Sequence, residues 1–229
     1  MSADFDAHAR SYAEDVSGSV AFSGKDVEFF TRRKAHHLVD LARRHLGDPL
    51  ALRVLDVGCG IGMTDALLAS WLGERHGIDV AAAAGAQAAE RNPTVSYATY
   101  DGGRLPYEDA SFDLAFTVCV LHHVERADRA AFTAEMARVV RRGGLVAVFE
   151  HNPYNPLTRV AVSRCEFDEG VELLTRAEAT GLLTGAGLEP VEGRYILFLP
   201  IDGAWTAAVE RACRGIPLGA QHYVVAERV

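Results

Sequence analysis

Three glycines in the stretch VLDVGCGIG, residues 54–62, alternate with other residues directly after a predicted strand. Gly58, Gly60 and Gly62 permit positive φ angles and a close approach of a ligand to the backbone. The helical pattern MTDALLASWLG follows at once, so backbone N–H groups and a helix N-terminus face the same ligand. A dinucleotide fingerprint would have its third glycine where Met63 stands, which weakens the hypothesis of an NAD-dependent oxidoreductase.

Carboxylates accompany this loop at three points. Asp56 lies inside the preceding strand, where it suits a ligand that carries an ammonium group and no phosphate. Asp79 ends the next predicted strand, 21 residues after Gly58, and can accept hydrogen bonds from both hydroxyls of a ribose. Asp101 follows the third strand and can accept from an adenine amino group. Together they predict an adenosine-type ligand with an amino group.

Polar residues also follow the fourth and fifth predicted strands. The turn VLHHV ends that fourth segment with His123, and HNPYNP, residues 151–156, places His151 and Tyr154 beside two prolines. His151 suits a general base because an imidazole titrates near neutral pH. We expect His151, Tyr154 and His123 to be the catalytic candidates. The alternatives are that His123 only positions the ligand and that the HNPYNP loop only shapes the pocket.

Short apolar runs alternate with helical patterns from residue 53 onward, which predicts an α/β fold with a doubly wound, mostly parallel sheet. The expected strands are 53–58, 75–80, 94–100, 112–118 and 143–150, followed by 195–200 and an antiparallel 222–229. The expected helices are 4–14, 25–46, 62–72, 80–91, 126–140, 175–188 and 202–214. Gly143 and Gly144 are expected to end the helix over 126–140, and Thr175 with Glu178 predicts a capping box.

The combined motifs resemble the class I (Rossmann-like) S-adenosylmethionine-dependent methyltransferases. The resemblance rests on VLDVGCGIGMT (54–64), GIDV (77–80), YDGGRLPYEDASFD (100–113), VLHHV (120–124) and VVRRGGLVAVFE (139–150). It implies a seven-stranded sheet with a reversed last strand. It also implies an N-terminal helical cap over 1–50 and a cofactor-binding domain over 51–229, with an insertion over 151–174 that covers the acceptor.

The same resemblance implies S-adenosylmethionine (SAM) as the cofactor. Its ribose would lie on Asp79 and its adenine near Asp101 and Gly102, while Tyr12 in FDAHARSYAED would close over its methionine part. One of Arg32, Arg33 and Lys34 is expected to pair with its carboxylate, with Arg32 as the first candidate, and Val118 is expected to offer only a backbone contact. The full set of expected cofactor residues is Tyr12, Arg32, Asp56, Gly58, Cys59, Gly60, Asp79, Val80, Asp101, Gly102, Val118 and His123.

Composition limits the partners. The chain has 31 acidic and 23 basic residues and a formal charge of -8, which disfavours a nucleic-acid partner. No apolar run suggests a membrane span. Four cysteines without a CxxC pair argue against a metal knuckle and fit a cytoplasmic protein, and no metal is expected. The sequence leaves the oligomeric state open, a homodimer included.

These features predict methyl transfer from SAM to an oxygen, nitrogen or carbon atom of a small-molecule acceptor. One alternative keeps SAM but lets an internal nucleophile attack it, which would release methylthioadenosine. A second alternative is a partner subunit that binds SAM without turnover. The NAD-dependent oxidoreductase is a third, which Met63 and Asp56 disfavour.

Overall fold

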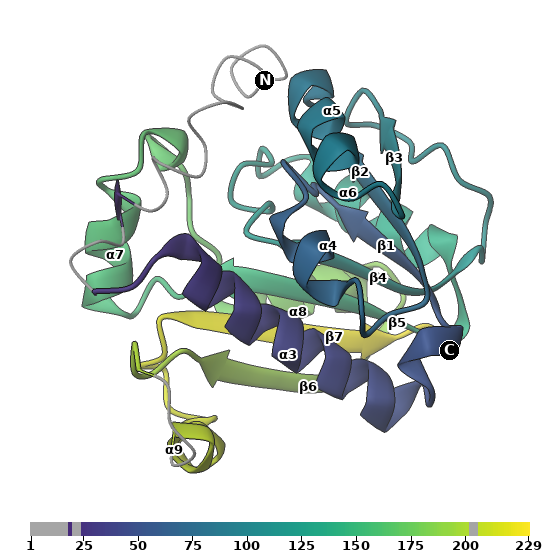
Figure 1. The fold of residues 1–229 in the computed structure, drawn as a ribbon. Coiled ribbons are helices and arrows are strands. Elements are labelled where there is room, and N and C mark those ends of the chain that lie inside the picture. The colour runs from purple at the N-terminus through teal and green to yellow at the C-terminus, as the bar shows by residue number, and fades with distance from the viewer. Residues whose placement is uncertain (1–17, 20–23, 202–205) are drawn as a thin grey trace.

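The computed structural model describes residues 18–19, 24–201 and 206–229. Within these residues seven strands form one sheet in the order β3-β2-β1-β4-β5-β7-β6 (Figure 1). β1 to β5 run parallel, and β7 runs antiparallel to both β5 and β6. The predicted fold class, with its reversed last strand, is confirmed. The strands are β1 (Arg53–Val57), β2 (Glu74–Asp79), β3 (Ser96–Thr99), β4 (Phe112–Val118), β5 (Val140–His151), β6 (Glu189–Ile196) and β7 (Gln221–Glu227).

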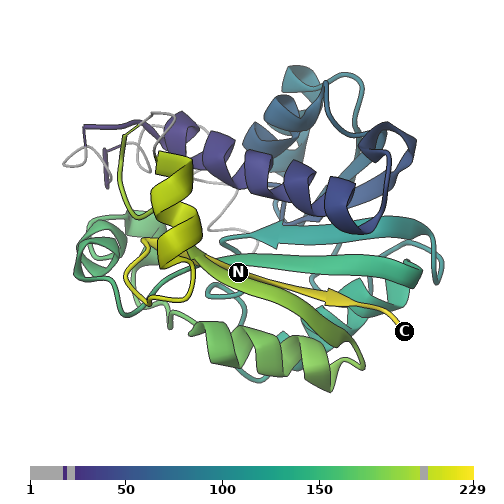
Figure 2. The ribbon, with the colours of Figure 1, turned by 90° about the horizontal axis from the view of Figure 1, so that it is seen from below.

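Helices cover both faces of the sheet. α3 (Val27–His45) and α4 (Met63–Leu68) pack on one face, and α6 (Arg129–Val139) and α8 (Arg176–Gly185) pack on the other, as the view in Figure 2 shows for α3 and α8. Successive residues of β1 enter opposite cores, because Val54 packs with the α3 layer and Leu55 with the α6 layer. Burial on both faces explains why the central strands read as continuous apolar runs. The remaining helices are η2 (Pro49–Ala51), α5 (Ala82–Arg91), α7 (Pro156–Val162), η3 (Glu166–Asp168) and α9 (Thr206–Cys213).

Several boundaries differ from the expected ones. α6 ends at Val139, and Gly143 and Gly144 lie inside β5 rather than after a helix. Gly143 adopts a φ of +73° and donates its N–H to the carbonyl of Arg228, so these glycines shape the irregular start of a strand. β6 starts six residues before the predicted 195, and α4 ends at Leu68.

The N-terminal prediction is tested only in part. The helix expected over 25–46 is confirmed by α3, which Asp26 caps by accepting from the N–H of Phe29 at 2.9 Å. The helix expected over 4–14, and Tyr12 with it, lies outside the described residues. Among the helices that the structure describes, none has the length and apolar character needed to cross a membrane.

Candidate functional site

The glycine loop is held open by the neighbouring strand. Gly58 has a φ of +80° and donates its N–H to the carbonyl of Ile78 at 2.7 Å. A Cβ there would come within 2.5 Å of a Val120 methyl group, so this position requires glycine. Gly60 donates its N–H to Oδ2 of Asp79 at 2.7 Å, and a Cβ there would meet no atom within 4 Å. Hydrogen bonds to Ile78 and Asp79 of β2 therefore hold the loop, and the backbone at Gly60 leaves space for a ligand.

A cavity of about 870 Å³ lies along this edge of the sheet. Asp79 lines it from the end of β2, and its Oδ1 accepts from the N–H of Ala81 at 2.9 Å. Asp101 lines it from the loop after β3, with Oδ1 accepting from the N–H of Gly103 at 2.9 Å. The structure thus brings together most of the predicted cofactor residues. Those that line this cavity are Gly58, Gly60, Asp79, Val80, Asp101, Gly102, Val118 and His123.

A second cavity, of about 220 Å³, adjoins the first. The residues that line both cavities are Gly58, Gly60, Ile61, Val118, Cys119, His123 and Phe167. The second cavity extends to the carboxyl end of β5 and to the segment after it, through His151, Thr158 and Asp168. The two adjoining cavities therefore extend from Asp79, past the end of β4, to the segment expected to cover an acceptor.

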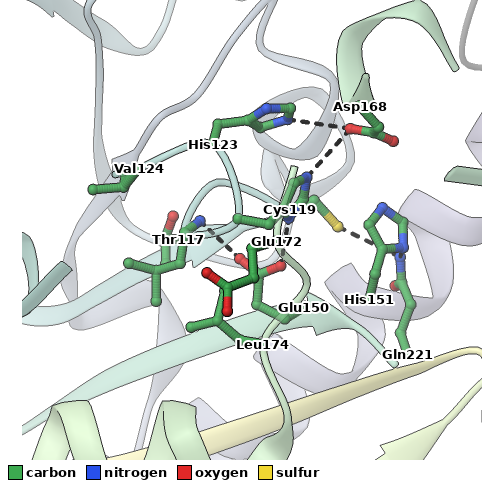
Figure 3. A network of polar contacts seen from close by, with 12 residues as sticks. Thr117, Cys119, His123, Val124, Glu150, His151, Asp168, Glu172, Leu174 and Gln221 are labelled. Carbon is green, nitrogen blue, oxygen red and sulfur yellow. Dashed lines mark hydrogen bonds and ion pairs between the residues drawn. The ribbon is translucent and has the colours of Figure 1, made fainter. Parts of the chain in front are cut away.

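Ionisable side chains gather at the second cavity, and Figure 3 shows His123, Glu150, His151 and Asp168 in one network of polar contacts. Nδ1 of His122 lies 2.6 Å from Oε2 of Glu150, whose Oε1 accepts from the N–H of Leu121 at 2.8 Å. Nε2 of His122 and Nε2 of His123 each lie 3.3 Å from Oδ1 of Asp168. The turn after β4, the end of β5 and η3 thus meet in one polar cluster.

Residues 55–148 match the family model for a methyltransferase domain. The computed structure is similar to the TehB-like SAM-dependent methyltransferase of Corynebacterium glutamicum, with a TM-score of 0.65 and 16% identity over 97% of this chain and 99% of that one. Residues 55–148 therefore form a domain of the methyltransferase family, and the fold of the described residues is that of SAM-dependent methyltransferases. SAM is the cofactor of the family.

The match to this chain covers different shares of its sequence relatives. The 2-methyl-6-phytyl-1,4-hydroquinone methyltransferase of Synechocystis sp. is 36% identical over 108 residues, which cover 45% of this chain and 33% of the relative. The ubiquinone biosynthesis O-methyltransferase of Cereibacter sphaeroides is 28% identical over 187 residues, covering 71% of this chain and 72% of the relative. The match therefore spans about a third of the first relative and most of the second.

Asp56 provides a test of whether SAM fits this member of the family. The residue is buried, lines the second cavity, and its Oδ1 has no hydrogen-bond partner among the described residues. Burial, followed by the charges of Asp65 and Asp79, holds the pKa of Asp56 well above its usual range. A buried carboxylate oxygen without a partner is costly, and a cation in the cavity would satisfy it. The residues present therefore fit a ligand with an ammonium group.

Arg32 does not lie in this methyltransferase's cavities. It is exposed, lines neither cavity, and pairs with Glu28 at 3.0 Å one helical turn before it. Lys34 is the basic residue that lines the second cavity, with only 8% of its surface exposed and Nζ 3.9 Å from Sγ of Cys119. Lys34, and not Arg32, is thus the candidate cationic partner for the carboxylate of SAM. Helical spacing offered the missing signal, because Thr31, Lys34 and Leu38 share the buried face of α3.

His151 and Asn155 are the members of the HNPYNP segment that line the cavity, and His151 is the ionisable one. Its Nδ1 lies 3.4 Å from Nε2 of Gln221, which also donates to Sγ of Cys119 at 3.4 Å. Burial, and then the positive charge of His122, lower the pKa of His151 to about 4, so its ring is neutral at physiological pH. For His122, burial favours the neutral form, but Glu150 and Asp168 outweigh it and raise the pKa to about 10.

The other polar residues of HNPYNP serve the backbone. Nδ2 of Asn152 donates to the carbonyls of Gly219, at 2.7 Å, and Pro217, at 3.1 Å. Asn155 caps α7 by accepting from the N–H of Thr158 at 3.0 Å. Tyr154 is 58% exposed and lines a separate groove beside β6. The structure therefore places Tyr154 outside the cavity that His151 and His123 share, contrary to the expectation.

Asp168 and Gln221 are the cavity residues that sequence reasoning missed. Asp168 lies in the segment SRCEFDEG, which offers no periodicity or spacing that links it to the histidines. Gln221 begins β7, 70 residues after its partner His151. Cys59 is buried between the loop glycines, and burial raises its pKa well above the usual range, which leaves an inert thiol.

Proposed function

We propose that this protein transfers a methyl group from SAM to a hydroxyl group of a small organic acceptor. The observation that carries the proposal is that the two cavities adjoin at Val118 and Cys119, with the half-buried His123 and His151 on the acceptor side. The name of the Cereibacter sphaeroides relative records an O-methyl transfer, which supports oxygen as the acceptor atom. The formal charge of -8 speaks against a nucleic-acid substrate.

Each end of SAM would meet a different part of the chain. Asp79 would hold the ribose, and Val80, Asp101 and Gly102 would surround the adenine. The backbone around Cys59, open at Gly60, would lie against the middle of the molecule. The orphaned Asp56 would accept from the amino group.

The remaining contacts lie towards the acceptor. Lys34 would pair with the cofactor's carboxylate, because among the described residues that line the second cavity it is the only lysine or arginine. Val118 and His123 would flank the junction between cofactor and acceptor, since both residues line both cavities.

SAM supplies an activated methyl group, so the chain's main task is to orient the acceptor and to exclude water. Proximity and orientation alone account for on the order of 7–11 kcal/mol in well-aligned model reactions. His151 contributes a neutral imidazole that can hydrogen-bond the acceptor hydroxyl. A pKa near 4 makes it a weak base, so we assign it an orienting role and a transient share of the hydroxyl proton on its way to water.

The acceptor cavity suggests the size and character of the substrate. At about 220 Å³ it suits a small molecule rather than a macromolecular segment. Its wall combines apolar side chains with the ionisable cluster at one end. A compact hydroxylated molecule with an apolar body fits this arrangement. The apolar lining residues include Val27, Phe30, Leu157, Ala161, Val162, Leu197, Phe198 and Pro200.

The experiment follows the products by mass spectrometry. The purified chain is incubated with SAM and, separately, with a panel of small phenols, alcohols, amines and carboxylic acids. We expect S-adenosylhomocysteine together with a methylated product for at least one hydroxylated compound, and none without acceptor. Methylthioadenosine as the nucleoside product would point to internal attack, and SAM binding without turnover on any compound would contradict methyl transfer.

His151 is tested with the acceptor found in that panel. His151→Ala should lower turnover by at least about tenfold, because it removes a polar contact at the reacting end of the acceptor. His151→Gln should recover part of that loss, since an amide can still hydrogen-bond. Full turnover in His151→Ala would remove His151 from the site.

A further inference from the structure

Three potential metal-ligand atoms converge at the wall of the acceptor cavity. They are Nε2 of His122, Nε2 of His123 and Oδ1 of Asp168, and all lie within 4.8 Å of one another. The carboxylate oxygen is 3.3 Å from each imidazole nitrogen (Figure 3). Bonds of about 2.0–2.2 Å in a tetrahedral zinc site place ligand atoms roughly 3.3–3.6 Å apart. The two measured separations therefore match those of ligands around a single ion.

His122 is oriented as metal-binding histidines are. Its Nδ1 is 2.6 Å from the buried carboxylate of Glu150, which fixes the ring and directs Nε2 towards Asp168. The side chain is only 1% exposed, and its Nε2 faces the Asp168 carboxylate at 3.3 Å. Histidines that bind metals usually donate their second ring N–H to a carboxylate in this way. A buried nitrogen aimed at a carboxylate and a second histidine is therefore a ligand position.

The cluster lies beside the space proposed for the acceptor. His122, His123, Asp168 and His151 all line the second cavity, so coordination positions left open by three protein ligands face the space proposed for the acceptor. Two histidines and one carboxylate suit divalent first-row transition metals, whereas calcium and magnesium prefer oxygen ligands.

We propose that His122, His123 and Asp168 bind one divalent transition-metal ion, with Glu150 orienting His122, and that its open position takes an oxygen donor of the acceptor. This inference rests on the proposed function for the identity of that oxygen, but the metal site itself does not. Coordination lowers the pKa of a hydroxyl, so a bound alcohol or phenol releases its proton to water. That chemistry would supply the activation that the weakly basic His151 lacks.

Metal binding is measured directly on the full chain, with any affinity tag removed and the protein stripped with a chelator. Calorimetry with Zn²⁺ should give one equivalent per chain, and Co²⁺ should show the visible absorption bands of a four- or five-coordinate ion. His123→Gln and Asp168→Asn should each weaken Zn²⁺ binding by at least about tenfold. His45→Gln and Asp40→Asn, on the exposed side of α3, are the matched controls and should bind as the wild type does.

Two results would overturn the metal site. One is the absence of a stoichiometric Zn²⁺ or Co²⁺ complex with the wild-type chain. The other is wild-type affinity in both His123→Gln and Asp168→Asn. The Co²⁺ spectrum uses the unaltered chain, so it decides the matter even where a variant fails to fold. If the chain binds no metal but still forms S-adenosylhomocysteine in the presence of an acceptor, the proposed function is supported and only the metal site is contradicted.

Discussion

The two halves of the site are built by opposite means. On the cofactor side, ligand-facing groups come mainly from the backbone of one glycine loop and from carboxylates at successive strand ends, as with Gly60 and Asp79. On the acceptor side, the groups are buried side chains from the turn after β4, the end of β5, η3 and the start of β7. The first half is a local structure supported by one sheet edge. The second exists only where four distant segments meet.

The halves also differ in electrostatics. The acceptor side holds His122 between the carboxylates of Glu150 and Asp168, so its charges are paired inside the fold. The cofactor side leaves Asp56 buried with an oxygen that no described residue satisfies. We therefore expect substitutions on the acceptor side to cost stability, and substitutions on the cofactor side to cost ligand affinity.

The largest effect should follow from Glu150→Ala. Removing one partner of a buried ion pair leaves the other charge uncompensated and typically costs about 3–5 kcal/mol. We expect a loss of that order in the free energy of unfolding, measured by urea denaturation. Glu172→Ala is the control, because Glu172 pairs with Arg126 at 2.6 Å on the surface and should change stability by less than about 1 kcal/mol. Equal losses in the two variants would contradict the buried pair.

Asp79→Asn should act on the cofactor instead. It keeps the shape of the side chain but removes the charge that accepts from Gly60 and would accept from a ribose. A hydrogen bond to a charged group contributes about 1.5–3 kcal/mol, which corresponds to roughly 10- to 150-fold in Kd. Calorimetry with S-adenosylhomocysteine measures it. Asp40→Asn, an exposed control, should leave Kd unchanged, and an unchanged Kd in Asp79→Asn would remove the ribose contact.

Asp56→Asn should raise the free energy of unfolding of the ligand-free chain, whereas Glu150→Ala should lower it. The pKa of Asp56 is raised in the fold, so the wild type loses stability as pH rises above the unfolded value of about 3.9. We expect the variant to be more stable than the wild type by roughly 1–2 kcal/mol at pH 8, with the difference vanishing near pH 4. SAM affinity should fall in the same variant. A variant less stable than the wild type across that pH range would contradict an unpaired Asp56.

The smallest effect belongs to Tyr154→Ala. Tyr154 is exposed and lies outside both cavities that meet at Val118, so its removal should behave as an ordinary surface substitution. Such changes stay within about 0.5 kcal/mol, which is about twofold in turnover. Steady-state kinetics with the acceptor identified in the panel checks this. A large drop in turnover would return Tyr154 to the acceptor site.

The sequence predicted which residues would gather at the glycine-loop edge of the sheet, because the information for that edge is local. A strand, a glycine loop and a helix are contiguous, and an acid at each strand end reaches the same sheet edge by topology alone. The parallel order of β1 to β5 then places Asp79 and Asp101 without any knowledge of side-chain packing. Arg32 was the exception, since choosing it over Lys34 required the buried face of α3 to be identified.

The acceptor half could not be predicted in the same way. Asp168 and Gln221 come from segments whose sequence gives no sign of which residues they will meet. In HNPYNP, the residue types alone do not distinguish a polar side chain that faces a ligand from one that hydrogen-bonds a backbone carbonyl. Asn152 proved to be of the second kind, because it bonds the carbonyls of Pro217 and Gly219. His151 was correctly expected to be near the site, but its low basicity depends on burial and on His122.

The placement of β7 has a consequence for synthesis on the ribosome. β7 lies between β5 and β6 although it follows both in the chain, and among the described strands β6 pairs with β7 alone. The first five strands can fold before β7 has been synthesised, when β6 has no strand to pair with. The glycine loop and Asp79 belong to that first part. The acceptor side closes only once Gln221 and the strand it begins have emerged. A nascent chain should therefore acquire the ability to bind the cofactor before it acquires a pocket for the molecule to be methylated.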